Sequence, residues 1–217
     1  MSKRKTLSAI KMTLFLIINI VMISCGSGGP AEQSQATKAD GTVIDLAKVS
    51  EKIKNAIAFA EGIKEVETLI KSIDEFVKGI GKKLKKDDGT LEAEDNGNNG
   101  QLVAGVYSLV SGIDAKLAGL EQKAGVSDEL KAKIAGVKAK SKPFLDKLKD
   151  DDLCKKAVTD AHIKNAIDKN DNTGGKGKEE LIALNASIDE LLKGAADAVE
   201  AAITELTMPA KVATAKP

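Results

Sequence analysis

The sequence predicts an all-α fold, a bundle of about five helices in which the first and the last helix are long. Lys, Glu, Asp, Ala and Leu dominate the composition, and most of these residues favour helix. Apolar residues recur at alternating steps of three and four, which is the period of one helix face. Only four Pro occur in 217 residues, and three lie near the termini. With no Trp, one Tyr and four Phe, the core of this single domain is expected to be aliphatic.

Residues 42–84 form the most regular stretch and predict the first helix, which at about 1.5 Å per residue would approach a length of about 60 Å. A second apolar row widens the stripe beyond a coiled-coil seam, so this helix is expected to pack against several neighbours. The spacing breaks once, at Glu67, and Gly79 and Gly81 weaken the end of the segment. The main row consists of Leu46, Val49, Ile53, Ala56, Ala60, Ile63, Ile70, Ile73, Val77, Ile80 and Leu84.

Turn sequences occupy residues 85–100, where Asp-Asp-Gly and Asn-Gly combinations flank Thr90-Leu91-Glu92. They are compatible with a short β-hairpin after the first helix or with an exposed loop, and the loop is favoured. A calcium-binding loop is excluded, because the spaced ligands and the distal Glu of that motif are absent.

Four further helices follow in the apolar pattern, separated by Gly-rich or Asn-rich breaks. Ser127 is a predicted N-cap, and Pro143 is placed to kink or divide the helix that follows it. The long first and last helices are expected to be antiparallel neighbours, which would bring both ends of the domain together. The predicted helices span 101–124, 127–148, 150–169 and 178–207, with a loop at 170–177.

Residues 1–24 read as a lipoprotein signal peptide, with a basic start, an apolar stretch from Met12 to Ile23, and a small residue before Cys25. The apolar stretch is shorter than the about 20 residues that cross a membrane. Cys25 is therefore the predicted lipidation site, and acyl chains on it would anchor the chain to a membrane. Met22 stands where strict lipoprotein signals prefer Leu. Residues 25–41 are expected to be a lipidated flexible tether, 42–207 the helical domain and 208–217 a disordered tail.

The charge balance argues against nucleic acid as a partner. The whole chain has 33 basic and 32 acidic residues, and removing the leader takes away four basic residues and no acidic one, which leaves a net charge of −3. The scarcity of aromatic residues also removes the platforms on which bases stack.

No constellation of catalytic residues or metal ligands emerges, and no cofactor is expected. His162 is the only His, and Cys154 eight residues earlier lacks a third partner or a nucleophile motif. Gly174-Gly175-Lys176-Gly177-Lys178 lacks the spacing of a phosphate loop and a strand before it. With Cys25 acylated, Cys154 is either a buried small hydrophobe or an intermolecular link, and the buried interpretation is favoured.

Two lysine clusters are candidate sites for anionic glycans or acidic proteins. Solvated helix faces are the favoured interpretation of both, because Asp and Glu are interspersed nearby. One cluster comprises Lys82, Lys83, Lys85 and Lys86; the other lies in the third predicted helix and begins with Lys131, Lys133, Lys138 and Lys140.

The Ser-Cys-Gly leader junction, the polar tether, the long first helix and the Lys-Pro end together resemble the outer surface protein C / variable small protein family of Borrelia lipoproteins. Residues 55–84 and 101–123 look most like the relapsing-fever variable small proteins. The resemblance implies a helical surface antigen with five helices and a short hairpin after the first, forming a homodimer largely through the first helix. It also implies a serotype-defining role in escape from host antibodies, and no catalytic residues. Spirochaetal signals tolerate residues other than Leu at the position of Met22.

Three functions follow from the residues and the resemblance. The first is a non-enzymatic variable coat antigen. The second is an adhesin that binds a host protein or glycosaminoglycan through the lysine clusters or a groove at the dimer interface. The third, a periplasmic lipoprotein that binds a small molecule, has no residue pattern in its favour.

Overall fold

The computed structural model describes residues 35–37, 43–94 and 97–207. The predicted signal peptide 1–24, Cys25 and the predicted tail 208–217 lie outside the described residues. The chain divides into two compact units, one comprising Met1–Ala47 with Ala210–Pro217 and the other Lys48–Pro209. The two units are described separately below.

The first unit contains one small antiparallel sheet. Strand β1 (Gln35–Thr37) pairs with β2 (Val43–Asp45), with Ala36 opposite Ile44. Strand β1 falls within residues 25–41, the predicted tether, for which the sequence indicated no regular structure.

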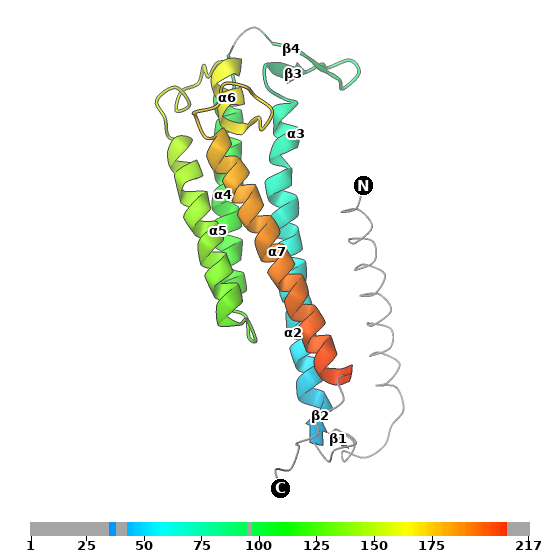
Figure 1. Cartoon of the computed structure of the whole chain (residues 1–217). Coiled ribbons are helices and arrows are strands. Elements are labelled where there is room, and N and C mark those ends of the chain that lie inside the picture. The colour runs from blue at the N-terminus through cyan, green and yellow to red at the C-terminus, as the bar shows by residue number, and fades with distance from the viewer. Residues whose placement is uncertain (1–34, 38–42, 95–96, 208–217) are drawn as a thin grey trace. The chain divides into compact units, whose positions relative to one another are not determined.

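The second unit is helical, which confirms the predicted fold class (Figure 1). Its first rod consists of two helices in succession, and counting that rod once gives five helices in the described part of the chain. A two-stranded sheet follows the first rod, as the hairpin alternative predicted. The elements are α2 (Leu46–Lys71), α3 (Ile73–Val77), β3 (Lys82–Leu84), β4 (Leu91–Ala93), α4 (Gly100–Glu121), α5 (Asp128–Lys147), α6 (Asp160–Ile167) and α7 (Lys178–Thr207).

Glu67, where the apolar spacing of the first helix breaks, is buried. Its carboxylate accepts hydrogen bonds from Lys64 and Lys71, one turn away on either side along α2. These two ammonium groups lower the pKa of Glu67 against the raising effect of burial. A buried carboxylate is tolerated when it is paired in this way.

The first rod ends earlier than predicted. We expected helix to Leu84, but α3 ends at Val77 and residues 82–84 form β3. Gly81 has a φ of 66°, which turns the chain out of the helix. A Cβ at this position would also overlap the carboxylate of Asp160, so the turn is fixed from outside the segment.

The predicted helix 150–169 is also wrong in its first half, because only Asp160–Ile167 is helical. The carboxylate of Asp150 accepts a hydrogen bond from the amide of Asp152 over 2.9 Å, which makes a local turn instead of a helix start. The hydroxyl of Thr159 accepts from the amide of His162 over 3.3 Å and caps α6. Ser127 caps α5 as predicted, accepting from the amide of Leu130 over 3.3 Å, and α5 continues through Pro143.

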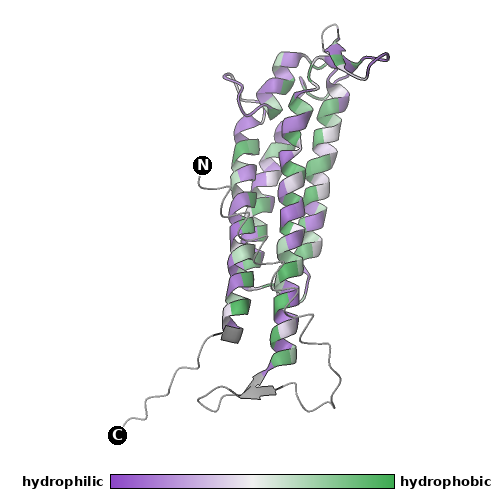
Figure 2. Cartoon of the chain, turned by 90° about the vertical axis from the view of Figure 1, so that its right-hand side faces the viewer, coloured by the Kyte–Doolittle hydropathy of each residue, from purple (hydrophilic) through white to green (hydrophobic). Residues whose placement is uncertain are grey.

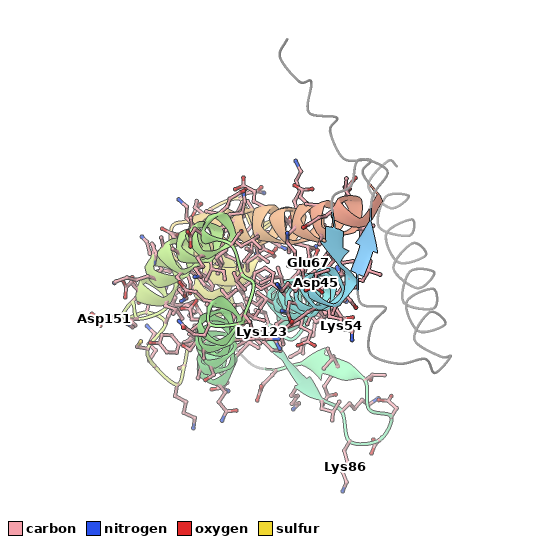
Figure 3. The ribbon with its side chains drawn as sticks, turned by 90° about the horizontal axis from the view of Figure 1, so that it is seen from below. Asp45, Lys54, Glu67, Lys86, Lys123 and Asp151 are labelled. Carbon is pink, nitrogen blue, oxygen red and sulfur yellow. The ribbon has the colours of Figure 1, made fainter. Side chains whose placement is uncertain are left out.

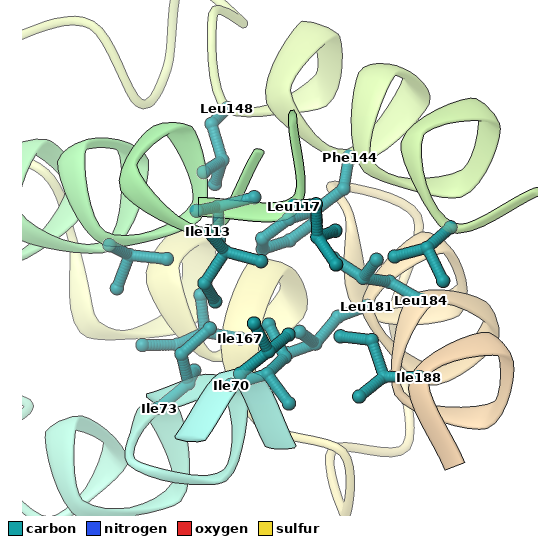
Figure 4. Close-up of a cluster of buried hydrophobic side chains, with 14 of the residues drawn as sticks. Ile70, Ile73, Ile113, Leu117, Phe144, Leu148, Ile167, Leu181, Leu184 and Ile188 are labelled. Atoms are coloured by element: carbon teal, nitrogen blue, oxygen red, sulfur yellow. The ribbon is translucent and has the colours of Figure 1, made fainter. Parts of the chain in front are cut away.

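The core is an aliphatic seam that runs along the inside of the bundle (Figure 4). Each helix carries apolar residues on one side and polar residues on the other (Figure 2). Full burial of one large apolar side chain contributes about 1.5–3 kcal/mol to the stability of the fold. Helix α4 is long and apolar enough to cross a membrane by composition, yet one of its faces lies in this seam. The buried residues of that face are Val103, Val106, Val110, Ile113, Leu117 and Leu120. The largest fully buried residues include Ile63, Ile70, Ile73, Ile113, Leu117, Ile134, Phe144, Leu148, Ile163, Ile167 and Leu181.

Helices α2 and α7 are antiparallel, as predicted. Lys52 pairs with Glu205 near one end, and Lys71 lies 3.6 Å from Asp189 farther along. A Cβ on Gly125, in the α4–α5 connection, would lie 3.5 Å from the Cβ of Asn55. Residues 48–54 of α2 and 199–205 of α7 therefore continue past this connection as a pair, which we call the two-helix stem (Figure 1).

Gly100, the first residue of α4, provides a test of this packing. A Cβ there would overlap the carbonyl oxygen of Lys155 and lie 2.9 Å from that of Lys156, both rigid backbone groups. We expect Gly100→Ala to lower the free energy of unfolding by about 1–3 kcal/mol, the usual cost of overpacking.

Gly112→Ala is the matched control in the same helix, because nothing lies within 4 Å of a Cβ at that position. Replacing Gly by Ala in a helix interior should raise stability by up to about 1 kcal/mol. Urea unfolding followed by circular dichroism gives both values. Equal stability of the two variants would contradict the close contact between α4 and residues 155–156.

Candidate functional site

The loop end of the bundle is the main candidate site. It consists of residues 78–94, 97–99, 148–159 and 168–177, which lie at the opposite end of the helices from the two-helix stem (Figure 1). Cys25, the predicted lipidation site, lies outside the described residues.

Buried Asn99 organises the base of the hairpin. Its side-chain oxygen accepts from the amide of Gly81 over 3.1 Å, and its side-chain nitrogen donates to the carbonyl of Val158 and to the carboxylate of Asp160 over 3.0 and 2.8 Å. One side chain thereby connects the hairpin to the start of α6. Sequence reasoning missed this role, because Asn-Asn-Gly indicates a turn but gives no sign of a partner about 60 positions away.

A network of charges joins the loop after α5 to the loop before α7. The ammonium group of Lys176 lies 3.0 Å from Asp150 and 2.8 Å from Asp152, and Lys155 lies 3.1 Å from Asp152. Hydrogen bonds from Lys176 and Lys155 lower the pKa of Asp152 to about 2. The Nε2 atom of His162 lies 3.8 Å from the same carboxylate. This distance places the His162 ring beside the charge network of Lys176, Asp150, Asp152 and Lys155.

An open hollow of about 990 Å³ lies between the start of α4 and the loop after α5. Tyr107, Cys154 and Lys149 are among its lining residues, and the Lys149 ammonium lies 6.0 Å from the centre of the Tyr107 ring. The favoured interpretation of Cys154 as buried is wrong, because this Cys is exposed. The cause is the absence of the expected helix at 150–159, which would have turned the residue towards the core.

The four lysines proposed on α5 do not gather on one face. Lys131 and Lys138 lie seven residues apart on one side, and Lys133 and Lys140 occupy a different side, about 200° around the helix. Lys131 and Lys133 lie 3.8 and 3.9 Å from Asp128 and Glu129, and Lys138 lies 2.6 Å from Glu121. Among the described residues only Lys140 of the four lacks an ion-pair partner. Their role in ligand binding stays a prediction.

The cluster at Lys82–Lys86 lies on the β3–β4 hairpin, and Lys86 projects away from the bundle (Figure 3). Lys83 lies 3.7 Å from Glu92 and Lys85 lies 3.1 Å from Asp88. Within the described part of the chain, Lys82 and Lys86 have no ion-pair partner.

The Gly-rich loop before α7 is occupied by the chain itself. The carboxylate of Glu179 accepts from the amide of Gly175 over 3.1 Å, and the ammonium of Lys178 donates to the carbonyl of Asp171 over 2.6 Å. Across residues 43–94 and 97–207, no three His, Cys, Asp or Glu side chains come close enough to hold a metal ion.

A polar pair lies in the interface of α4 and α5. The hydroxyl of buried Ser141 donates to Asp114 over 2.7 Å, while the other carboxylate oxygen of Asp114 is buried without a hydrogen-bond partner in the described structure. Burial raises the pKa of Asp114, although Ser141 and Lys138 act in the opposite direction.

Comparisons with known proteins agree along nearly the whole chain. A family model described as "Lipoprotein" matches residues 43–212. Variable small protein 11 of Borrelia hermsii is 48% identical over 214 residues, covering 96% of this chain and 99% of that protein. Outer surface protein C of Borreliella burgdorferi is 41% identical over 213 residues, covering 95% of each. The solved structure of variable small protein 1 of Borrelia turicatae is 50% identical, with a TM-score of 0.68, and covers 75% of this chain and 99% of that one.

The carboxylates of Asp152 and Asp114 should affect stability in opposite ways. The folded-state pKa of Asp152 lies at about 2, below its ordinary 3.8, so the ionised group stabilises the fold above pH 3.8 and this contribution disappears as the pH falls towards 2. We expect Asp152→Asn to unfold more easily than the unaltered protein at pH 7, and the two to converge near pH 2.

Asp114→Asn is the control of opposite sign. Its folded-state pKa is raised, so the charged group opposes folding at neutral pH, and Asn still offers an oxygen to Ser141. We expect this variant to be at least as stable as the unaltered protein at pH 7. Urea midpoints measured from pH 7 to pH 2 test both statements, and a pH-independent deficit in Asp152→Asn would show that its ion pairs are not the cause.

Proposed function

The chain belongs to the family of Borrelia lipoproteins that includes the variable small proteins and outer surface protein C, and from this premise we propose that it is a surface-exposed outer-membrane lipoprotein acting as a serotype-defining variable antigen in immune evasion. In this proposal the protein has no enzymatic activity. Its partners are the outer membrane, through lipid on Cys25, and host antibodies.

The position of the loop end carries this proposal. The chain enters α2 beside Lys52 and leaves α7 beside Glu205, and these two residues form an ion pair. The loops at 78–94, 97–99, 148–159 and 168–177 lie at the other end of the helices (Figure 1). An anchor that precedes α2 therefore favours display of the loop end outwards. Loops accept substitution more readily than cores, which suits a protein that varies under antibody pressure.

Lipid on Cys25 is the attachment that this proposal requires. A lipoprotein Cys carries more than one acyl chain, and each buried methylene contributes about 0.8 kcal/mol to membrane binding. Residues 25–41 would give the helical unit reach from the membrane, in keeping with the tether predicted from their composition.

The adhesin alternative receives less support from the geometry of α5. Its four candidate lysines lie on different sides of the helix, and Lys131, Lys133 and Lys138 each have a carboxylate nearby. Anionic glycan would have to compete with these ion pairs. The hairpin lysines Lys82 and Lys86 lack such competition.

Protease shaving of intact cells tests the surface location. We expect rapid loss of the protein while a periplasmic marker stays intact, because the loop end would face the medium. Cys25→Ser is the control, since it removes the lipid acceptor and should leave the protein protected inside the cell. Complete protection of the unaltered protein, persisting after other surface proteins are stripped, would overturn the proposal.

A homodimer through α2 is the second part of the proposal. Leu69 and Phe76 lie seven residues apart on one face of the first rod and stay only half-buried within one chain. Apolar area of this kind remains available to a second copy.

Sedimentation of the chain from Gly26 onwards tests the dimer. We expect a dimer at a protein concentration of tens of micromolar, which requires an association free energy of about −6 kcal/mol or more negative. Leu69→Lys with Phe76→Lys should shift the protein to monomer, whereas Ile182→Lys, at an exposed apolar position on α7, should not. A monomer in the unaltered chain would contradict the proposal.

A further inference from the structure

The β3–β4 hairpin exposes an apolar pair that no element of the bundle covers. Leu84 is 68% exposed and Leu91 is 51% exposed, and the two face each other in the register of the strands. Lys82 faces Ala93 in the same register, so these four side chains share one face of the sheet. Large apolar side chains are seldom left together on a surface unless the surface has a partner.

The outer edge of β3 also has unpaired backbone groups. The amides of Lys85 and Glu94 donate across the hairpin over 2.8 and 2.9 Å. Because hydrogen-bonded pairs alternate along an antiparallel ladder, the backbone groups of Lys82 and Leu84 point outwards. The amide of Lys82 donates a hydrogen bond to the carbonyl of Gly79 over 3.1 Å. The carbonyl of Lys82 and both backbone groups of Leu84 are left without a protein partner among the described residues.

The charges on the hairpin indicate which kind of strand would fit this edge. On its inner edge, β3 already pairs with residues 91–94, Leu-Glu-Ala-Glu, in which apolar and acidic residues alternate. Lys83 lies 3.7 Å from Glu92 in that pairing. Lys82, on the face of Leu84, has no ion-pair partner in the described part of the chain. An acidic residue opposite Lys82 and an apolar one opposite Leu84 would complete that face.

We propose that the outer edge of β3 is a docking site for an extended segment of another protein, added as a third strand, in which an acidic residue stands two positions from an apolar one so that both lie on the same face. Backbone hydrogen bonds would supply affinity, and contacts with Leu84 and Lys82 would supply selection. With so short an edge, a single contact is weak, and dense display on a surface strengthens it through avidity. The outward direction of the hairpin rests on the proposed anchoring, whereas binding to the edge does not.

Fluorescence anisotropy with the full-length protein in detergent tests the docking site. The probe is a labelled ten-residue peptide that repeats Thr-Leu-Thr-Glu-Thr, in which Leu and Glu stand two positions apart and lie on the same face of a strand. We expect sub-millimolar binding that weakens about tenfold or more with Leu84→Ser, because the peptide then loses the burial of one Leu side chain. Ile182→Ser, at another exposed apolar residue, is the matched control and should bind as the unaltered protein does.

Two further comparisons separate strand addition from simple attraction of charge. Lys82→Glu should weaken binding strongly and Lys86→Glu, in the turn beside Asp87, only slightly. A peptide of the same sequence with N-methylated backbone amides should not bind, because it cannot donate to the edge of β3. Equal effects of the two lysine changes, or undiminished binding of the methylated peptide, would overturn the proposal.

Other occupants of the hairpin give distinct results. If the protein alone forms a species larger than a dimer that Leu84→Ser disperses, a second copy occupies the edge. If phosphatidylglycerol vesicles bind through Leu84 and the peptide does not compete with them, the occupant of the hairpin is a lipid surface. Either result overturns the peptide proposal and leaves the surface-antigen proposal standing, since protease shaving tests that separately.

Discussion

The aliphatic seam inside the bundle is the interaction on which the other features depend. Without Trp, and with Phe59 and Phe144 as its buried aromatic residues, the seam must gather many contributions of a few kcal/mol from Ile, Leu and Val. Long helices supply those residues in sufficient number, which explains why α2, α4, α5 and α7 each exceed five turns. Glu67, the charged residue buried in the first rod, is neutralised locally by Lys64 and Lys71 of its own helix.

The loop end is held by a different kind of contact. Asn99 joins the hairpin to α6 by three hydrogen bonds, and Lys176 joins two loops through Asp150 and Asp152. Such contacts depend on a few specific side chains, whereas most of the loop surface takes no part in them. Substitution elsewhere in the loops would therefore leave the seam and the loop positions unchanged. This separation is what a variable antigen requires, and it follows from the division between apolar and polar contacts.

The sequence predicted the helices where periodicity was the deciding signal. Apolar spacing predicted helix at 42–84, 101–124 and 178–207, and the first rod (46–77), α4 and α7 lie at these places. Ser127 was identified as an N-cap from its residue type and position. The prediction failed where distant contacts override local preference, at β3 and at 150–159. Gly81 turns the chain because Asp160 and Asn99 lie against it. The carbonyl groups of residues 155–156 lie so close to Gly100 that a Cβ there would not fit. The exposure of Cys154 and the pairing of the α5 lysines depend on such contacts, so composition and spacing did not reveal them.

The two-helix stem has a mechanical consequence. Over about 10 Å, α7 is the only described helix beside the about seven residues at the start of α2, whereas the rest of the bundle has four long helices in cross-section. Val49, Ile53 and Ala202 are buried in this stretch but lie outside the aliphatic seam. Local opening costs the least free energy where few apolar contacts must be broken, so the two-helix stem should open before the rest of the bundle. A single cut in the two-helix stem at the start of α2 would therefore release the rest of the helical unit as a folded body.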